Sequence, residues 1–70
     1  MEQEELETRF TYHPPKSDLQ KQQYEDIRGA ALGIAEWLNN VLPESREKSL
    51  AIRRLEEVVF WANAALARRS

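Results

Sequence analysis

Residues 45–69 read SREKSLAIRRLEEVVFWANAALARR, and this stretch predicts the architecture of the chain. Apolar residues recur in it at alternating steps of three and four, at Ile52, Leu55, Val59, Ala62 and Leu66. This spacing is typical of one face of a packed helix. Further apolar residues fall outside that face, at Leu50, Ala51, Val58, Phe60, Trp61, Ala64 and Ala65. Because a helix that is apolar on several sides is usually buried on several sides, we expect this one to have more than one packing partner.

A second helical pattern lies before this stretch. Ser17 or Asp18 can cap its start, and the same steps of three and four run through Tyr24, Ile27, Ala31, Ile34, Leu38 and Val41. Pro43 should end this helix because proline lacks an amide hydrogen, and Ser45 can cap the next helix. A connection of about three residues makes the two helices antiparallel, which predicts an all-α helical hairpin.

The N-terminal part of the chain should be an arm. Pro14 and Pro15 do not fit inside a helix, and His13 should be extended because it precedes a proline. We therefore assign residues 1–17 to an arm and residues 18–70 to a single hairpin domain, and the arm can include a short helical turn over residues 2–7.

The size of the chain predicts self-association. A domain of 70 residues buries only about 60% of the surface that its unfolded chain exposes. The chain has no cysteine and one histidine, so disulfides and a structural zinc site are excluded as sources of stability. Exposing Trp37, Phe60 and Trp61 together would also leave a large apolar patch. These features predict a homo-oligomer, either a compact dimeric four-helix bundle or a higher assembly.

Charge and composition exclude several classes of function. The net charge is −2, and four of the acidic residues fall within residues 1–7, which leaves the remainder at +2. This is too weak for a surface that binds DNA or RNA polymers. There is no membrane span and no signal peptide, so a cytoplasmic protein is the default expectation. No catalytic set of serine, histidine and acid is apparent, and we expect neither an enzyme nor a bound cofactor.

Several residues of the arm are candidates for ligand contact. The tyrosine ring of Tyr12, on a segment braced by two prolines, could stack on a nucleobase. Lys16 could reach a phosphate, with a solvated lysine as the alternative, and His13 lies between these two residues. Phe10 could instead act as a hydrophobic staple that pins the arm to the hairpin.

Three arginines are candidates for binding phosphate. The planar guanidinium of Arg28 suits phosphate oxygens, although it could instead pair with Glu25 or Glu36. Arg68 and Arg69 close the second long helix, where cations also interact favourably with the helix dipole. Around a symmetry axis of an oligomer, the same two arginines would form an anion pocket.

Several motifs taken together resemble a known family. They are Phe10-Thr11-Tyr12-His13-Pro14-Pro15-Lys16, Tyr24-Glu25-x-Ile27-Arg28, Pro43-x-Ser45-Arg46-Glu47-Lys48-Ser49-Leu50-Ala51-Ile52, Leu55-Glu56-Glu57 and Trp61-Ala62-Asn63-Ala64-Ala65-x-Ala67-Arg68. This combination, over about residues 9–69, is similar to a phage-encoded hairpin family of sponges. Members of that family sequester the cyclic-nucleotide signals of the CBASS and Thoeris anti-phage defence systems.

The resemblance implies a homohexamer in the cytoplasm of the infected bacterial host that binds cyclic dinucleotides, such as 3′,3′-cGAMP, without cleaving them. It implies that Tyr12 stacks on the ligand and that Arg28 meets its phosphates. It also implies that Arg68 or Arg69 serves a three-fold pocket for cyclic trinucleotides in some members. A threonine that contributes to that pocket is replaced here by Ala30, which cannot donate a side-chain hydrogen bond.

The residues leave two other functions open. One is a small helical adaptor that oligomerises and docks a protein partner through its surplus apolar surface. The other is a small DNA-binding regulator, which the low net charge and the lack of a recognition helix argue against.

Overall fold

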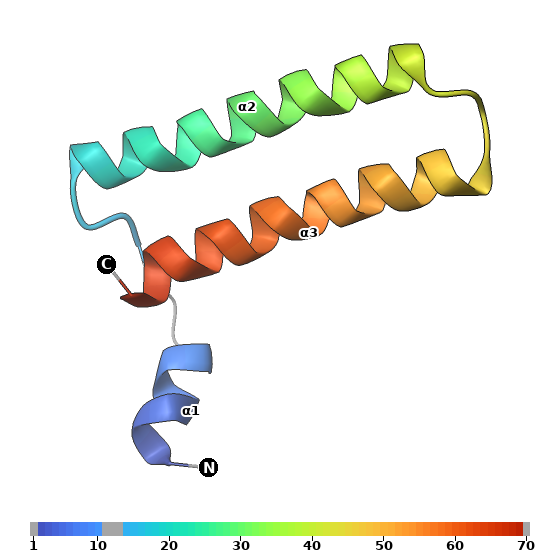
Figure 1. Cartoon of the computed structure of the whole chain (residues 1–70). Coiled ribbons are helices and arrows are strands. Elements are labelled where there is room, and N and C mark those ends of the chain that lie inside the picture. The colour runs from blue at the N-terminus through green and yellow to red at the C-terminus, as the bar shows by residue number, and fades with distance from the viewer. Residues whose placement is uncertain (1, 11–13, 70) are drawn as a thin grey trace.

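The computed structural model describes residues 2–10 and 14–69, which form three helices and no strand. Helix α1 spans Gln3–Phe10, α2 spans Asp18–Val41 and α3 spans Arg46–Arg69. Helices α2 and α3 lie antiparallel as a hairpin, and α1 lies beyond the end at which α2 begins and α3 finishes (Figure 1). The predicted all-α hairpin is confirmed.

Both long helices begin at serine caps. The Oγ of Ser17 accepts a hydrogen bond from the backbone N of Gln20 at 3.1 Å, and the Oγ of Ser45 accepts one from the backbone N of Lys48 at 3.1 Å. Each bond satisfies one of the amides that a first helical turn leaves without a partner. The last helical bond of α2 runs from Leu42 N to Leu38 O, directly before Pro43. The predicted bounds of both long helices therefore rest on observed caps.

The face of α3 that packs against α2 is the predicted one. Its members are all half-buried: Ile52, Leu55, Val59, Ala62 and Leu66. The predicted face of α2 is partly wrong, because Ile34 and Val41 are 47% and 53% exposed, whereas Ala35 and Leu42 are half-buried. A strict alternation of three and four drifts around a straight α-helix, so the real face moves forward by one residue at each of these two positions.

The two buried residues of the described chain are both polar. Gln20 is 5% exposed and Lys48 is 6% exposed, and no described hydrophobic residue is buried. Gln20 Nε2 donates to Leu66 O at 2.9 Å, and Lys48 Nζ donates to Asn39 O at 3.0 Å. Gln20 therefore closes the hairpin where α2 begins, and Lys48 closes it where α2 ends.

The N-terminal helix is longer than expected. The sequence predicts a short turn over residues 2–7, but α1 runs from Gln3 to Phe10. Phe10 is 83% exposed, so the predicted staple against the hairpin is wrong. The boundary between arm and hairpin domain at residue 17 stays a prediction.

The two glycines of α2 make no close contact within the protomer. A Cβ atom built at Gly29 or at Gly33 would meet nothing within 4 Å. Neither glycine is therefore required for the packing of α2 against α3.

None of the helices in the described residues has both the length and the apolar composition that a membrane span requires.

Candidate functional site

The outer faces of the hairpin carry large apolar side chains. Exposed examples on α2 and α3 are Leu19, Leu32, Ile34, Trp37, Val41, Val58, Phe60 and Trp61. The rings of Phe60 and Trp61 meet edge to face, with centroids 5.2 Å apart. The hairpin thus leaves Trp37, Phe60 and Trp61 exposed together, and the homo-oligomer that would cover them stays a prediction.

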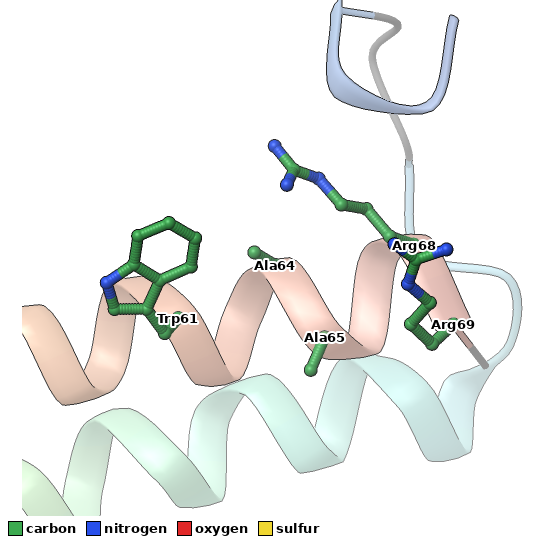
Figure 2. Close-up of a pocket in the computed structure, with 5 residues that line it drawn as sticks. All are labelled: Trp61, Ala64, Ala65, Arg68 and Arg69. Carbon is green, nitrogen blue, oxygen red and sulfur yellow. The ribbon is translucent and has the colours of Figure 1, made fainter. Parts of the chain in front are cut away.

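Arg68 and Arg69 line a hollow at the end of α3. It has a volume of about 230 Å³, and its other walls are Trp61, Ala64 and Ala65. Both arginine side chains extend from the last helical turn, beyond the two alanines (Figure 2). Small alanine side chains leave room between the indole and the guanidinium groups. The hollow therefore combines an aromatic surface with two positive charges, a combination that suits an anion with an aromatic part.

A wider hollow adjoins this one on the side of α1. Its volume is about 430 Å³, and Glu5, Arg9 and Phe10 line it together with Trp61, Arg68 and Arg69. Arg9 Nε donates to Glu5 Oε1 at 3.0 Å, so these two charges offset each other. The arginines of α3 supply the remaining positive charge of this hollow.

Arg28 is an exposed guanidinium on the middle part of α2. It forms no hydrogen bond or ion pair with any described residue, so the alternative pairing with Glu25 or Glu36 is not observed. Ten residues separate it from the start of α2 at Asp18, or about 15 Å along the helix. It is not among the residues that line the hollows of Arg68 and Arg69. The predicted arginines thus fall into two separate positions on one protomer.

Lys16 lies at the start of the hairpin and is exposed. It lines a hollow of about 280 Å³ with Ser17, Leu19, Gln20 and Gln23. Its backbone N donates to Gln20 Oε1 at 2.7 Å. The candidate residues Tyr12 and His13 lie outside the described residues, so their predicted roles stay predictions.

The charges of α3 other than its terminal arginines mostly face solvent. Arg53 is exposed, and Arg54 Nη1 donates to Glu57 Oε2 at 2.6 Å between two exposed side chains. Within residues 2–10 and 14–69, no group of three or more histidine, cysteine, aspartate or glutamate side chains could hold a metal ion. Among the described residues, the candidates for ligand contact stay Lys16, Arg28, Arg68 and Arg69.

Two polar residues, Gln20 and Lys48, hold the hairpin together through backbone carbonyls of the opposite helix. Lys48 lies in the first turn of α3, where a cation is unfavourable, but the antiparallel hairpin places its ammonium beside the C-terminal turn of α2, where it meets Asn39 O and Glu44. The unfavourable position of a cation in the first turn of α3 indicates another use for Lys48, and the ion pair with Glu44 fits its interpretation as a salt-bridge residue. Gln20 has no comparable signal, because its main partner, Leu66, lies 46 residues further along the chain.

Comparison with known protein families identifies the family of this chain. The model of the Acb2/Tad1 hairpin domain matches residues 2–67. The chain belongs to the Acb2/Tad1 hairpin family. No curated protein and no solved structure matches it.

Membership of the Acb2/Tad1 family implies a phage anti-defence role through the binding of cyclic nucleotides. It also indicates a binding protein rather than an enzyme. The resemblance drawn from the sequence motifs is thereby confirmed.

Proposed function

We propose that this Acb2/Tad1 hairpin protein sequesters cyclic oligonucleotide immune signals, cyclic dinucleotides such as 3′,3′-cGAMP first among them. The ligand is held without being cleaved, in the cytoplasm of the infected bacterial host. Defence effectors then receive no signal. Since a sponge acts by keeping its ligand, slow release matters more than any chemical step.

The main support for this proposal is the exposure of the Arg28 guanidinium on α2. Its guanidinium is exposed on a regular helix and has no hydrogen bond or ion pair with any described residue. Such a group can form charge-assisted, two-pronged bonds with a phosphate without first breaking an internal ion pair. Two copies of the chain related by a two-fold axis would offer one Arg28 and one Tyr12 to each half of a cyclic dinucleotide.

A second anion pocket is supported by the end of α3. Arg68 and Arg69 share a hollow with the Trp61 indole, about 15 Å along the hairpin from the level of Arg28. Copies assembled around a three-fold axis would bring three such ends together, which suits a cyclic trinucleotide. Ala30 cannot donate a side-chain hydrogen bond, so we expect this second ligand class to bind more weakly than the first.

Isothermal titration of the purified protein with 3′,3′-cGAMP tests the proposal. We expect tight binding at one ligand per two protomers, and a loss of at least about tenfold in affinity in Tyr12→Ala and in Arg28→Ala. Arg53→Ala, which removes an exposed arginine from the solvated face of α3, is the matched control and should bind as the wild type does. Chromatography of the released ligand should recover it intact.

The same titration can reject the proposal. If neither cyclic dinucleotides nor cyclic trinucleotides produce heat or a rise in melting temperature, the protein is not a sponge for them. The exposed aromatic side chains would then favour an adaptor that docks a protein partner.

A further inference from the structure

Asn63 is the one polar residue in the apolar run of residues 60–67 of α3. It is half-buried, and its Oδ1 is buried without a hydrogen-bond partner. Its Nδ2 also forms no hydrogen bond with any described residue. A buried polar atom without a partner costs stability, and such an atom in a folded chain calls for an explanation. Because neither end of the amide is held, the side chain can turn toward a ligand without breaking an internal bond.

Asn63 lies on the same broad face of the hairpin as Arg28. The hollow that Leu32 and Glu56 line, together with inner-face residues of both helices, marks this face. Arg28 precedes Leu32 by four residues and therefore shares its side of α2. Asn63 follows Glu56 by seven residues, two helical turns, and therefore shares its side of α3. We call the surface that these four residues share the Arg28 face.

Phe60 adds an aromatic ring to the Arg28 face. It follows Glu56 by four residues and precedes Asn63 by three, which places it on the same side of α3. Phe60 is 61% exposed, and its ring meets that of Trp61 edge to face with centroids 5.2 Å apart. The ring is therefore supported from one side and open to a ligand on the other.

The register of the hairpin brings these residues close together along its length. Gln20 Nε2 donates to Leu66 O at 2.9 Å, which sets these two residues opposite each other near the end where α2 begins (Figure 1). Counted from that pair along the helix axes, the level of Arg28 lies about 3 Å from that of Phe60 and about 8 Å from that of Asn63. A free guanidinium, an open ring and an unpaired amide at this spacing match the phosphate, the base face and the base edge of a nucleotide.

We propose that Asn63 and Phe60 contact the nucleobase of the nucleotide whose phosphate Arg28 binds, and that Asn63 makes this site prefer adenine. This inference rests on the proposed function. Adenine presents the N6 amino group beside the N7 acceptor, and an asparagine amide pairs with both. Guanine presents two acceptors, O6 and N7, at the same edge, so Oδ1 would find no donor there.

Isothermal titration with 3′,3′-cyclic di-AMP and 3′,3′-cyclic di-GMP tests the role of Asn63. We expect the wild type to bind cyclic di-AMP at least about tenfold more tightly, and Asn63→Ala to lose most of this difference through weaker binding of cyclic di-AMP. Arg28→Ala removes a contact to the phosphate that both ligands carry, so it should weaken both to the same degree. Asn40→Ala, which removes an exposed amide near the end of α2, is the matched control and should bind as the wild type does.

Two substitutions test the role of Phe60. Phe60→Leu keeps an apolar side chain but removes the ring, so it should weaken both ligands by about tenfold. Phe60→Tyr keeps the ring and should bind both ligands as the wild type does. Wild-type affinity in Phe60→Leu would overturn the base contact of this residue.

Measurements without ligand separate the base contact from other uses of Asn63. Asn63→Ala removes no internal hydrogen bond, so its melting temperature should not fall below that of the wild type. Sedimentation equilibrium should give it the mass of the wild type. A lower melting temperature would mean that the amide is held within the fold, and a smaller mass would mean that a second copy holds it. Either result would overturn the base contact.

The failure of this inference is distinct from the failure of the proposed function. If the wild type binds neither these ligands nor any other cyclic oligonucleotide, the proposed function fails and the base contact fails with it. If the wild type binds and Arg28→Ala weakens both ligands, the proposed function stands. An Asn63→Ala variant that then binds both ligands as the wild type does, or loses affinity for both equally, overturns the adenine preference alone.

Discussion

At the scale of single residues, the burial of Lys48 at the start of α3 is explained by its contact with the end of α2. Its ammonium donates to Asn39 O near the C-terminus of α2 and pairs with Glu44, which is almost fully exposed. A helix C-terminus carries partial negative charge and carbonyls without partners, so a cation there satisfies both. Lys48 therefore stabilises the fold mainly through its hydrogen bond to the backbone of α2, because an ion pair with an exposed carboxylate contributes little to stability.

Replacing Lys48 by methionine tests this assignment. Lys48→Met should lower the free energy of unfolding by about 1–3 kcal/mol, because it leaves a carbonyl without its partner in a half-buried place. Urea unfolding followed by circular dichroism measures the change. Arg54→Met breaks an exposed ion pair and should change stability by less than about 1 kcal/mol. Equal effects of the two substitutions would contradict the assignment.

At the scale of helices, the start of α3 depends on Ser45. Its Oγ accepts from Lys48 N and donates to Pro43 O at 3.0 Å, so one hydroxyl joins the connection to the helix. Ser45→Ala should lower the free energy of unfolding by about 1 kcal/mol, the usual cost of a lost cap. Ser49→Ala removes an exposed hydroxyl within the same helix and should be neutral or slightly stabilising in the same urea titration. A loss in Ser49→Ala equal to that in Ser45→Ala would rule out the cap.

Helix α2 should gain stability from alanine at Gly33. The added Cβ meets nothing within 4 Å, and the glycine lies in the helix interior. Gly33→Ala should therefore raise the free energy of unfolding by up to about 1 kcal/mol, because alanine restricts the unfolded chain and favours the helix. Thermal unfolding at fixed protein concentration measures this change. A fall in melting temperature together with a smaller assembly would instead place a second copy against this glycine.

At the scale of the whole molecule, the protomer is one helix thick. Its smallest extent is 13 Å, close to the diameter of a single helix with its side chains. Both broad faces of the hairpin are therefore open, which explains why its apolar residues are at best half-buried. Because the described residues form no buried apolar core, we expect a hairpin of this size to need further partners for stability.

Self-association should therefore be measurable in solution. Sedimentation equilibrium is expected to give a mass several times that of the protomer, and the melting temperature should rise with protein concentration. Trp37→Glu places a charge on an exposed apolar face and should shift the mass toward the protomer. Gln22→Glu adds the same charge at an exposed polar position and should leave the mass unchanged. A wild type that sediments as a protomer at all concentrations would contradict the expectation.

The local features of this protein follow from its amino-acid sequence alone. Serine caps at Ser17 and Ser45, the proline after α2 and the apolar spacing of α3 depend on residues within a few positions of one another. Such short-range effects can be predicted from a single sequence. They were sufficient to predict an antiparallel hairpin with more apolar surface than the two helices can bury against each other. The motifs of the chain were likewise sufficient to identify its family.

The contacts between side chains across the hairpin, in contrast, follow from the tertiary structure. Packing turns Ala35 and Leu42 toward α3 in place of Ile34 and Val41, since a straight helix does not keep a strict heptad face. It also buries Gln20 against a carbonyl 46 residues away. Contacts of this kind depend on the register between two helices, which is set by packing along their whole length rather than by any short stretch of sequence.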